Sequence, residues 1–320
     1  MPEAIAVGEL LIDFVSLDRD RPLSALPRFV GAAGGSAANV AVGLARQGVT
    51  AGFIGLVGED PFGQFLRQTM EAEGVDVSHL RFHPTARTTL AFLATRSDGL
   101  KDISFYRNPG ADMMLSPQDV EAGYLREARL FHFGAVSLSR SPAREATLFA
   151  ARTARAAGLL VSYDPNWRPT LWDDHEEARR VIWEAMPFAD VVHCAEEEWE
   201  FVTGTEELEA GAHRILSQGP RLVAVTQGQR GCYYDNGSAR GQIAGFPVEV
   251  ADATGAGDAF VAAMVTQLLR ETTPIGELPE ARLRAITRYA NAAGALTCTK
   301  PGVIPSLPMR AEVEGFVGGW

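Results

Sequence analysis

Backbone amides and a carboxylate occur together in the segment 250–260, which reads VADATGAGDAF. Gly255, Ala256 and Gly257 carry little or no side chain, so an anion can approach their amides closely. The apolar residues that follow have helical spacing, which predicts a helix beginning near Ala256 whose N-terminus favours phosphate. Asp258 falls in its first turn, where a carboxylate can take the proton of a hydroxyl that attacks a phosphate. An ordinary glycine turn before a helix would have the same pattern.

Small and polar residues also gather near the N-terminus. The sequence GAAGGSAAN precedes an apolar-periodic helix, and its Gly34 and Gly35 would let the backbone approach a ligand while Asn39 offers a donor and an acceptor. The run from Ile5 to Phe14 is apolar enough for a buried central strand, and its polar exception near the end, Asp13, has a typical ligand position. Close helix packing and a turn cap are the structural alternatives.

Polar clusters follow two later apolar runs. Asn166 and Arg168 come just after the first run, and a glycine turn that contains Thr226, Gly228 and Gly231 follows the second. Ligands in open α/β sheets bind outside the carboxyl ends of the strands. Both clusters are therefore candidate binding positions, and the second suits phosphate or ribose.

The elements that must position these residues alternate between strand and helix. Apolar runs such as 51–57 are followed by amphipathic segments over most of the chain, which predicts a doubly wound α/β sheet. The late helices are expected at about 279–288 and 289–297. We find no repeat and no linker, so residues 1–320 are expected to form a single domain.

Two β-rich runs, 88–95 and 103–107, interrupt this alternation. They are joined by Ser97-Asp98-Gly99, which indicates a hairpin. With short strands near Phe14 and Phe29, the hairpin predicts a small separate sheet that would act as a lid, built from about 12–31 and 86–108.

Two charged features carry weaker signals. Arg107 lies where the predicted lid rejoins the body, and its guanidinium could bind phosphate or sugar oxygens, although an isolated arginine is more often a solvated charge. The three glutamates at 196–198 are typical of a solvated helix start.

Composition excludes several classes of protein. The 320 residues are 46% apolar and 22% charged, with a formal net charge of -11, as in soluble globular proteins. A clustered basic face is absent from the sequence, so no nucleic-acid partner is expected. The three separated cysteines and the six histidines lack metal-ligand spacing, which predicts reduced thiols and no zinc site. Without a leader or a long apolar run, the protein is expected to be cytoplasmic with no membrane partner.

With these residues collected, the sequence resembles the ribokinase-like carbohydrate kinases of the PfkB family, and within them the fructokinases. The segment 252–258, DATGAGD, is similar to the family's C-terminal signature, and 34–39, GGSAAN, is similar to its N-terminal one. The resemblance implies a ribokinase-like α/β fold with a central, mostly parallel sheet, flanking helices and a small β-sheet lid. It also implies transfer of the ATP γ-phosphoryl group to a sugar hydroxyl with Mg²⁺, and a homodimer paired through the lids.

The resemblance further implies roles for individual residues. The base would be Asp258, and the anion hole would be formed by the amides of Gly255, Ala256 and Gly257. The sugar would be held by Asp13, Gly34, Gly35 and Asn39. The sugar and the transferring phosphate would face Arg107 and Arg168. The Mg²⁺ and phosphate network would include Asn166 and Glu198. The nucleotide side would include Thr226, Gly228, Gly231, Gly257 and Asn291. A monovalent cation, K⁺ in many family members, would be bound near Asp252, Thr254, Thr297, Lys300, Gly302 and Ser306.

One position departs from the family pattern, and three functions remain open. Ala195 stands where the family's N-x-x-E motif, which ends here at Glu198, has asparagine. The segments around Arg107 and Arg168 favour fructose, with fructose 6-phosphate as product. A 2-keto-3-deoxygluconate kinase is the alternative, although its acid substrate would need a further cation. A non-catalytic sugar-binding or regulatory protein is the alternative from another class, and the retained Asp258 argues against it.

Overall fold

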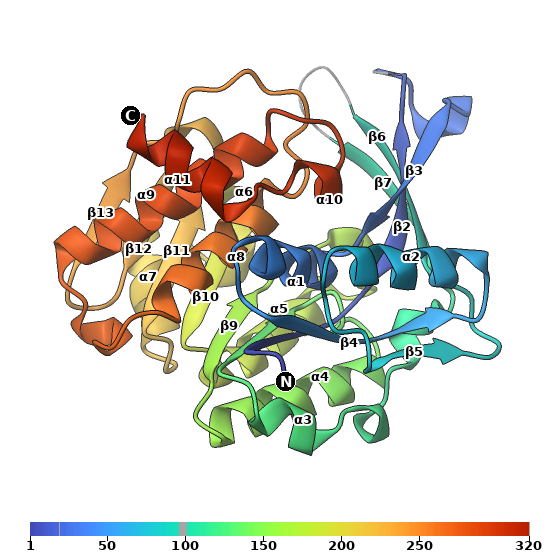
Figure 1. The fold of residues 1–320 in the computed structure, drawn as a ribbon, viewed down its shortest axis with the longest axis horizontal. Helices are drawn as coiled ribbons and strands as arrows, with labels where there is room; N and C mark the ends of the chain where they lie inside the picture. The colour runs from blue at the N-terminus through green and yellow to red at the C-terminus, as the bar shows by residue number, and fades with distance from the viewer. Residues whose placement is uncertain (19, 96–100, 320) are drawn as a thin grey trace.

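The computed structural model describes residues 1–18, 20–95 and 101–319, and its larger sheet has nine strands (Figure 1). Their order is β13-β12-β11-β10-β9-β8-β1-β4-β5. Neighbours from β11 to β5 run parallel, whereas β12 and β13 extend the sheet antiparallel at one edge. The strands are β1 (Ala4–Val7), β4 (Ala51–Gly58), β5 (Leu80–His83), β8 (Leu130–Gly134), β9 (Leu160–Asp164), β10 (Val191–Ala195), β11 (Leu222–Thr226), β12 (Cys232–Asp235) and β13 (Arg240–Ile243).

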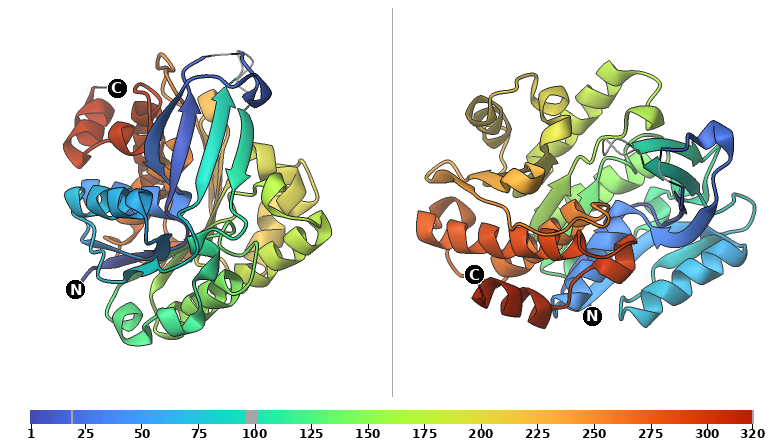
Figure 2. Two further views of the ribbon diagram at one scale, coloured as in Figure 1. Left: turned by 90° about the vertical axis from the view of Figure 1, so that its right-hand side faces the viewer. Right: turned by 90° about the horizontal axis from the view of Figure 1, so that it is seen from above.

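Helices cover both faces of this sheet, as the right-hand view of Figure 2 shows. One layer contains α1 (Ser36–Arg46), α2 (Pro61–Ala72), α8 (Ala256–Leu268), α9 (Glu280–Thr297), α10 (Val303–Ser306) and α11 (Arg310–Gly318). The other contains α3 (Ala122–Arg126), α4 (Ala143–Ala156), α5 (His175–Ala185), α6 (Glu196–Thr203) and α7 (Leu208–Leu216). Because both faces are covered, every residue of β1 and β4 is buried, which explains their nearly continuous apolar sequences. The predicted fold class is confirmed.

Short 3₁₀ helices connect several of these elements. They are η1 (Leu23–Ala25), η2 (Ala111–Met114), η3 (Pro117–Asp119), η4 (Pro169–Leu171), η5 (Met186–Phe188), η6 (Gly228–Arg230) and η7 (Ile275–Glu277).

A second sheet of four strands stands beside the larger one, as the left-hand view of Figure 2 shows. Its order is β3-β2-β6-β7, with β2 antiparallel to β3 and parallel to β6. The strands are β2 (Leu11–Ser16), β3 (Phe29–Gly34), β6 (Leu90–Thr95) and β7 (Lys101–Tyr106). The small sheet expected from the sequence is therefore present, although the turn predicted at Ser97-Asp98-Gly99 lies outside the described residues.

Two expectations about element boundaries are wrong. The run from Ile5 to Phe14 is not one central strand, because the chain leaves the large sheet after β1 and enters the small sheet as β2. Asp13 therefore lies within β2, where it faces Ala32 of β3 and Ala91 of β6. The two late helices predicted to meet at Arg288 form the single helix α9, since neither proline nor glycine interrupts the chain there.

Parallel strands bring the predicted polar clusters to one edge. Asp164, Ala195 and Thr226 are the last residues of β9, β10 and β11, which are neighbours in the sheet. The turns that follow these strands therefore open on the same side of the sheet, the side where open α/β folds bind ligands.

Candidate active site

A cavity of about 240 Å³ lies between the carboxyl edge of the large sheet and the small sheet. Side chains of β2, β6 and β7 line it on one side, and the N-termini of α1 and α8 line it on the other. The predicted site residues in its lining are Asp13, Gly35, Asn39, Asn166, Arg168, Thr254, Gly255, Gly257 and Asp258. Predicted residues from four distant parts of the sequence thus meet in one cavity.

Asp258 lies in the first turn of α8 with only 9% of its surface exposed. The Ser36 hydroxyl donates to its Oδ1 at 2.7 Å, and the Asn39 amide donates to its Oδ2 at 2.8 Å. Burial raises the pKa of Asp258 to about 6, while the two hydrogen bonds counteract part of this increase by favouring the charged form. The carboxylate is therefore ionised at neutral pH, yet it is a stronger base than an exposed aspartate.

Glycines allow the close approaches that shape this cavity. Gly255, at the N-cap of α8, has a left-handed backbone with φ of 82°, and a Cβ there would lie 2.4 Å from Val303 Cγ1. A Cβ on Gly35 would lie 2.4 Å from the Glu9 carbonyl oxygen, and one on Gly34 would overlap Asp13 Oδ2. Gly34 thus makes room for the Asp13 carboxylate and is not itself in the cavity lining.

Two residues of the cavity that the sequence reading did not assign are Glu9 and Ser36. The Ser36 amide donates to Glu9 Oε1 at 2.7 Å, and the Ser36 side chain donates to Asp258. Burial raises the pKa of Glu9 to about 7. Glu9 lies two residues beyond the end of β1, so a carboxylate shortly after a buried strand was the available signal.

Asp164, which belongs to the polar cluster after the strand but was given no role from the sequence, and His193, which was not assigned, form a buried pair in the lining of the cavity. Asp164 Oδ2 lies 3.2 Å from His193 Nδ1, and both residues line the cavity. Burial alone would raise the pKa of Asp164, but the imidazole lowers it overall, and Asp164 in turn outweighs burial and raises the pKa of His193. The backbone amide of Asn166 also donates to Asp164 Oδ1, at 3.1 Å, which stabilises the turn after β9.

Arg107, which the resemblance places facing the sugar and the phosphate, has its side chain paired away from this cavity. In the described part of the chain it lies outside the cavity lining, 6% exposed, with its Nε donating to Asp112 Oδ2 at 2.7 Å. A further nitrogen, Nη1, donates to the Ser139 hydroxyl at 2.9 Å. The positive charge is therefore neutralised by Asp112 behind the wall of the cavity, and Arg168 is the arginine that lines it.

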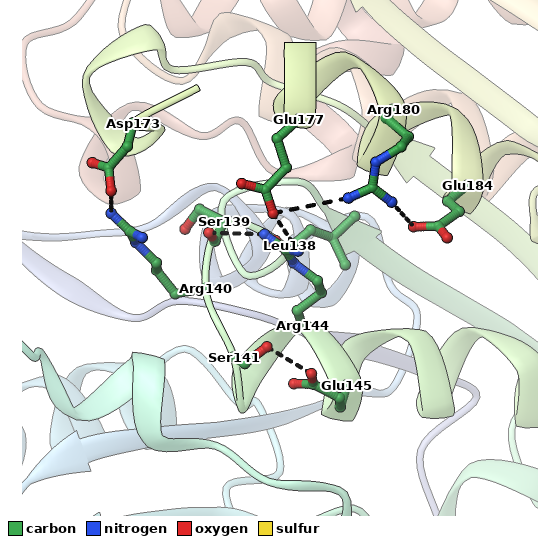
Figure 3. A network of polar contacts seen from close by, with 10 residues as sticks. All are labelled: Leu138, Ser139, Arg140, Ser141, Arg144, Glu145, Asp173, Glu177, Arg180 and Glu184. Carbon is green, nitrogen blue, oxygen red and sulfur yellow. Dashed lines mark hydrogen bonds and ion pairs between the residues drawn. The ribbon is translucent and has the colours of Figure 1, made fainter. Parts of the chain in front are cut away.

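Figure 3 shows a polar network around Arg144, in the segment that carries Ser139. Arg144 donates to the Leu138 carbonyl at 2.7 Å and to the Ser139 carbonyl at 3.2 Å, and it pairs with Glu177 of α5 at 2.8 Å. The Ser139 hydroxyl in turn donates to the carbonyl of Val136, which lines the cavity, at 2.7 Å. The network consequently positions both the wall and the Ser139 hydroxyl that contacts Arg107.

A second cavity, of about 390 Å³, lies on the other side of the first turn of α8. Its lining includes the predicted nucleotide residues Thr226, Gly228, Gly231, Gly257 and Asn291. Ala253 and Gly257 line both cavities, so the two adjoin at the glycine turn before Asp258. The side-chain amide of Asn291 donates to the backbone carbonyls of residues 243 and 244, each at 3.3 Å, which fixes the end of β13 against α9.

Glu198 is buried at the start of α6 and lies outside the linings of both cavities in the described structure. It accepts from the Trp167 amide at 2.6 Å and from the Ala195 amide at 3.0 Å. Burial raises the pKa of Glu198, and the nearby Asp164 raises it further. The expectation of a solvated helix start is therefore wrong for Glu198, which ties the Asn166–Arg168 turn to the end of β10. Ala195 lacks the asparagine side chain of the family motif, but its backbone amide donates to Glu198.

The residues matched to a monovalent cation site are only partly brought together. Asp252 Oδ1 accepts from the Thr254 amide at 2.9 Å, and Asp252 Oδ2 accepts from the Gly302 amide at 3.4 Å. The side chains of the other three contact different groups: Thr297 the Ala293 carbonyl, Ser306 the Val303 carbonyl and Lys300 the Glu312 carboxylate. Within the described ranges, no group of three or more His, Cys, Asp or Glu side chains is placed to hold a metal ion.

Comparison with known proteins decides the family. Residues 1–310 match the model of the pfkB family carbohydrate kinases. The chain belongs to this family. It is 40% identical to fructokinase-2 of Solanum habrochaites over 316 residues, which are 98% of this chain and 96% of that protein. Transfer of a phosphoryl group to a sugar is thus its activity class, as the sequence resemblance predicted.

Solved structures agree with this assignment. The kinase is 32% identical to the fructokinase of Xylella fastidiosa with bound ATP, with a TM-score of 0.88 over 100% of this chain and 99% of that one. It is 31% identical to a double mutant of the fructokinase of Vibrio cholerae O395 bound to fructose, ADP and a potassium ion. That comparison has a TM-score of 0.88 and covers 99% and 98% of the two chains.

One further finding concerns membranes. Among the described residues, no helix is both long and apolar enough to cross one.

Proposed function

We propose that this kinase transfers the γ-phosphoryl group of ATP to fructose, forming fructose 6-phosphate, with Asp258 as the general base. The observation that carries the proposal is the position of Asp258. It is a buried carboxylate with a pKa raised to about 6, in the first turn of a helix at which two cavities adjoin. A sugar in the smaller cavity and a nucleotide in the larger one would face each other across this turn.

The reaction needs a base and a positive environment, and both are provided. Asp258 would accept the proton of the attacking hydroxyl. The amides of residues 255–257 would hold the transferred phosphoryl group, helped by the positive end of α8. Arg168 lines the cavity and would neutralise charge that develops on the phosphoryl oxygens.

The proposal includes two cations, Mg²⁺ and K⁺, and the chain has some of the residues that would hold each of them. Mg²⁺ would neutralise the phosphates of ATP, with Asn166 and Glu198 as its protein-side contacts. Both Glu198 oxygens already accept backbone amides, which supports contact through water, a mode that Mg²⁺ favours. K⁺ would lie near Asp252 and Thr254, and the potassium ion in the Vibrio cholerae relative supports this.

Fructose is favoured over 2-keto-3-deoxygluconate by the charges in the smaller cavity. Its lining contains the acidic side chains of Glu9, Asp13, Asp164 and Asp258, and its basic side chains are Arg168 and His193, the latter paired with Asp164. A sugar acid would meet repulsion from these carboxylates, whereas the hydroxyls of a neutral sugar can donate to them. The fructokinase relatives support the same choice.

We also propose that the four-stranded sheet acts as a lid of the single kinase domain. Leu11, Leu93 and Phe105 of this sheet line the smaller cavity and would exclude water from the sugar. Val30 and Tyr106 on the same sheet are 49% and 66% exposed. Such exposed apolar side chains support pairing of two lids in a homodimer.

The test measures ADP release from the purified protein with ATP, Mg²⁺ and K⁺. The acceptors offered are the sugars fructose, ribose and glucose, the sugar acid 2-keto-3-deoxygluconate and the nucleoside adenosine. We expect turnover on fructose, and in Asp258→Asn a loss of roughly 10²- to 10⁴-fold with ATP binding retained. Selective turnover on another sugar would refute the choice of fructose. Near wild-type turnover of the variant would refute the base, and silence across the panel would favour a binding protein.

A further inference from the structure

His193 lies in the middle of β10, between the two cavities, and is 4% exposed. Its Nδ1 is 3.2 Å from Oδ2 of Asp164, which lines the smaller cavity. Its Nε2 is 3.1 Å from Oγ1 of Thr226, which lines the larger one. One imidazole ring therefore joins a carboxylate on the sugar side to a hydroxyl on the nucleotide side.

We propose that His193 is a positioning residue that couples the two substrate cavities, so that a nucleotide bound against Thr226 changes the affinity for sugar beside Asp164. The proposal rests on the proposed function, since it assigns sugar and nucleotide to these cavities. It concerns the linkage between the two binding events, which the choice of base and phosphate ligands leaves open.

The surroundings of the ring restrict its movement. The imidazole packs against Phe260 of α8, with ring centroids 5.4 Å apart. A Cβ on Gly257 would lie 3.5 Å from His193 Cε1, so the ring is also close to the turn shared by the two cavities. A shift of the Thr226 hydroxyl therefore cannot be absorbed by free rotation of the ring, and it passes on to Asp164.

The charges around the imidazole also link His193 to Asp164. The acidic groups that face His193 are Asp164, Glu198 and Asp258, all buried. The other imidazole nearby is His132 of β8, whose Nδ1 lies 3.1 Å from the Ser162 hydroxyl, and burial lowers the pKa of His132 to about 4. His132 is consequently neutral at pH 7, and the positive groups that lower the pKa of Asp164 are His193 first and then Arg168. Loss of the imidazole charge would release Asp164 Oδ2, although Oδ1 would still accept from the Asn166 backbone amide.

The coupling can be measured as a ratio of dissociation constants. Isothermal titration calorimetry would give the Kd of ADP, with Mg²⁺ present, in the absence and in the presence of saturating fructose. Coupling between two sites is reciprocal and typically changes affinity by about 5- to 150-fold. We expect a ratio in this range for the wild type, and the same ratio when fructose is titrated with and without ADP.

Two substitutions separate the two contacts of the ring. The amide of His193→Asn lies at the level of Nδ1 and can reach Asp164, whereas that of His193→Gln lies at the level of Nε2 and can reach Thr226. Each keeps one contact and breaks the link, so we expect the ratio to fall toward 1 in both. Thr226→Val, which removes the hydroxyl without changing the shape of the side chain, should have the same effect. Thermal unfolding would show that each variant is folded.

The outcomes distinguish this inference from the proposed function. If the role of His193 were merely structural, its replacement would raise the Kd of ADP by the same factor with and without fructose. The ratio of the two Kd values would then stay unchanged. An unchanged ratio in His193→Gln and Thr226→Val, or a wild-type ratio of 1, would overturn the coupling while the kinase remains intact. If the panel selects another sugar, the titrations use that sugar. A protein that binds ADP but no sugar would overturn both proposals.

Discussion

Asn39 Nδ2 donates to Asp258 Oδ2 at 2.8 Å, although the two residues are 219 positions apart in the chain. Asn39 lies in the first turns of α1, and Asp258 lies in the first turn of α8. Ser36 adds a second bond to the same carboxylate. The N-termini of two helices thus meet at one group, and the acidity of that group depends on both.

The first prediction concerns the pH dependence of turnover. Asp258 must be ionised to act as a base, so kcat/KM should rise with pH through about 6, the pKa to which burial raises this carboxyl. Ser36→Ala removes a donor that stabilises the charged form, so the pKa should rise further. A hydrogen bond of about 1 kcal/mol corresponds to a shift of the acid limb by about one pH unit upward.

The measurement is the pH profile of kcat/KM for the wild type and the variant. Ser238→Ala is a matched control, because that hydroxyl also makes a hydrogen bond, to the Gly276 carbonyl at 2.8 Å, but lies away from both cavities. The control should leave the acid limb in place. If the pKa of the acid limb were the same in Ser36→Ala as in the wild type, the limb would not report the ionisation of Asp258.

The second prediction concerns the buried ion pair of Arg107 and Asp112. Arg107→Met would leave Asp112 buried, with the Thr89 hydroxyl as a remaining donor, and should lower the free energy of unfolding by about 3 to 5 kcal/mol. Because Arg168 lines the cavity, Arg168→Met should instead reduce kcat/KM strongly with a smaller loss of stability.

Denaturant unfolding and steady-state kinetics would separate these effects. The exposed pair of Arg28 and Asp18 offers a control, since Arg28→Ala breaks an ion pair that water already screens and should change stability little. If Arg107→Met kept its stability but lost binding of the sugar, Arg107 would act on the substrate, as the sequence resemblance implied.

These cases show what the sequence could predict. Gly255, Gly257 and Asp258 are adjacent in the chain, and their chemistry follows from a local pattern of small residues and helical spacing. The strands that end at Asp164 and Thr226 follow from apolar runs, and their shared edge follows from parallel pairing. The fold class and much of the cavity were accordingly predictable.

Other features depend on contacts that no local pattern contains. The roles of Glu9 and His193 arise from burial and from partners that come from other elements, namely Ser36 and Thr226. Arg107 has the expected place after β7, but the nearby Asp112 neutralises it behind the cavity wall. A charged residue can be located from sequence more readily than its partner, because the partner is fixed by packing.

The third prediction concerns the stability of the protein without ligands. Burial raises the pKa of Glu9 from 4.5 to about 7, so the folded state binds the proton more tightly than the unfolded state. The contribution of Glu9 to stability is therefore complete below about pH 4.5 and is lost as the pH rises to about 7. Glu9→Gln cannot ionise, and its amide oxygen can still accept from the Ser36 amide.

The free energy of unfolding would be measured from pH 4 to 8 for both proteins. Between about pH 4.5 and 7 the wild type should lose on the order of a few kcal/mol relative to Glu9→Gln. The difference should be constant below this window, which serves as the internal control. Parallel curves through the window would show that the folded state does not retain the proton on Glu9.

The fourth prediction concerns the glycine at the N-cap of α8. Gly255→Ala places a Cβ on a left-handed backbone, at a cost of about 1–2 kcal/mol, and also within 2.4 Å of Val303 Cγ1. Gly74→Ala is the matched control, because Gly74 has φ of 78° against 82° for Gly255 and a Cβ there would meet nothing within 4 Å. Both variants should lose stability through their backbone conformation. The steric clash should occur only at Gly255.

The two variants should therefore differ in turnover. Relief of the clash has to move Val303, which also lines the smaller cavity, or the first turn of α8 that carries Asp258. A misplacement of about 1 Å in a catalytic turn costs about 10²-fold in rate, so kcat of Gly255→Ala should fall by at least about tenfold while that of Gly74→Ala stays near wild type. Equal kcat values in two folded variants would mean that the turn tolerates the displacement. The amides of residues 255–257 would then not be the groups that hold the phosphoryl oxygens.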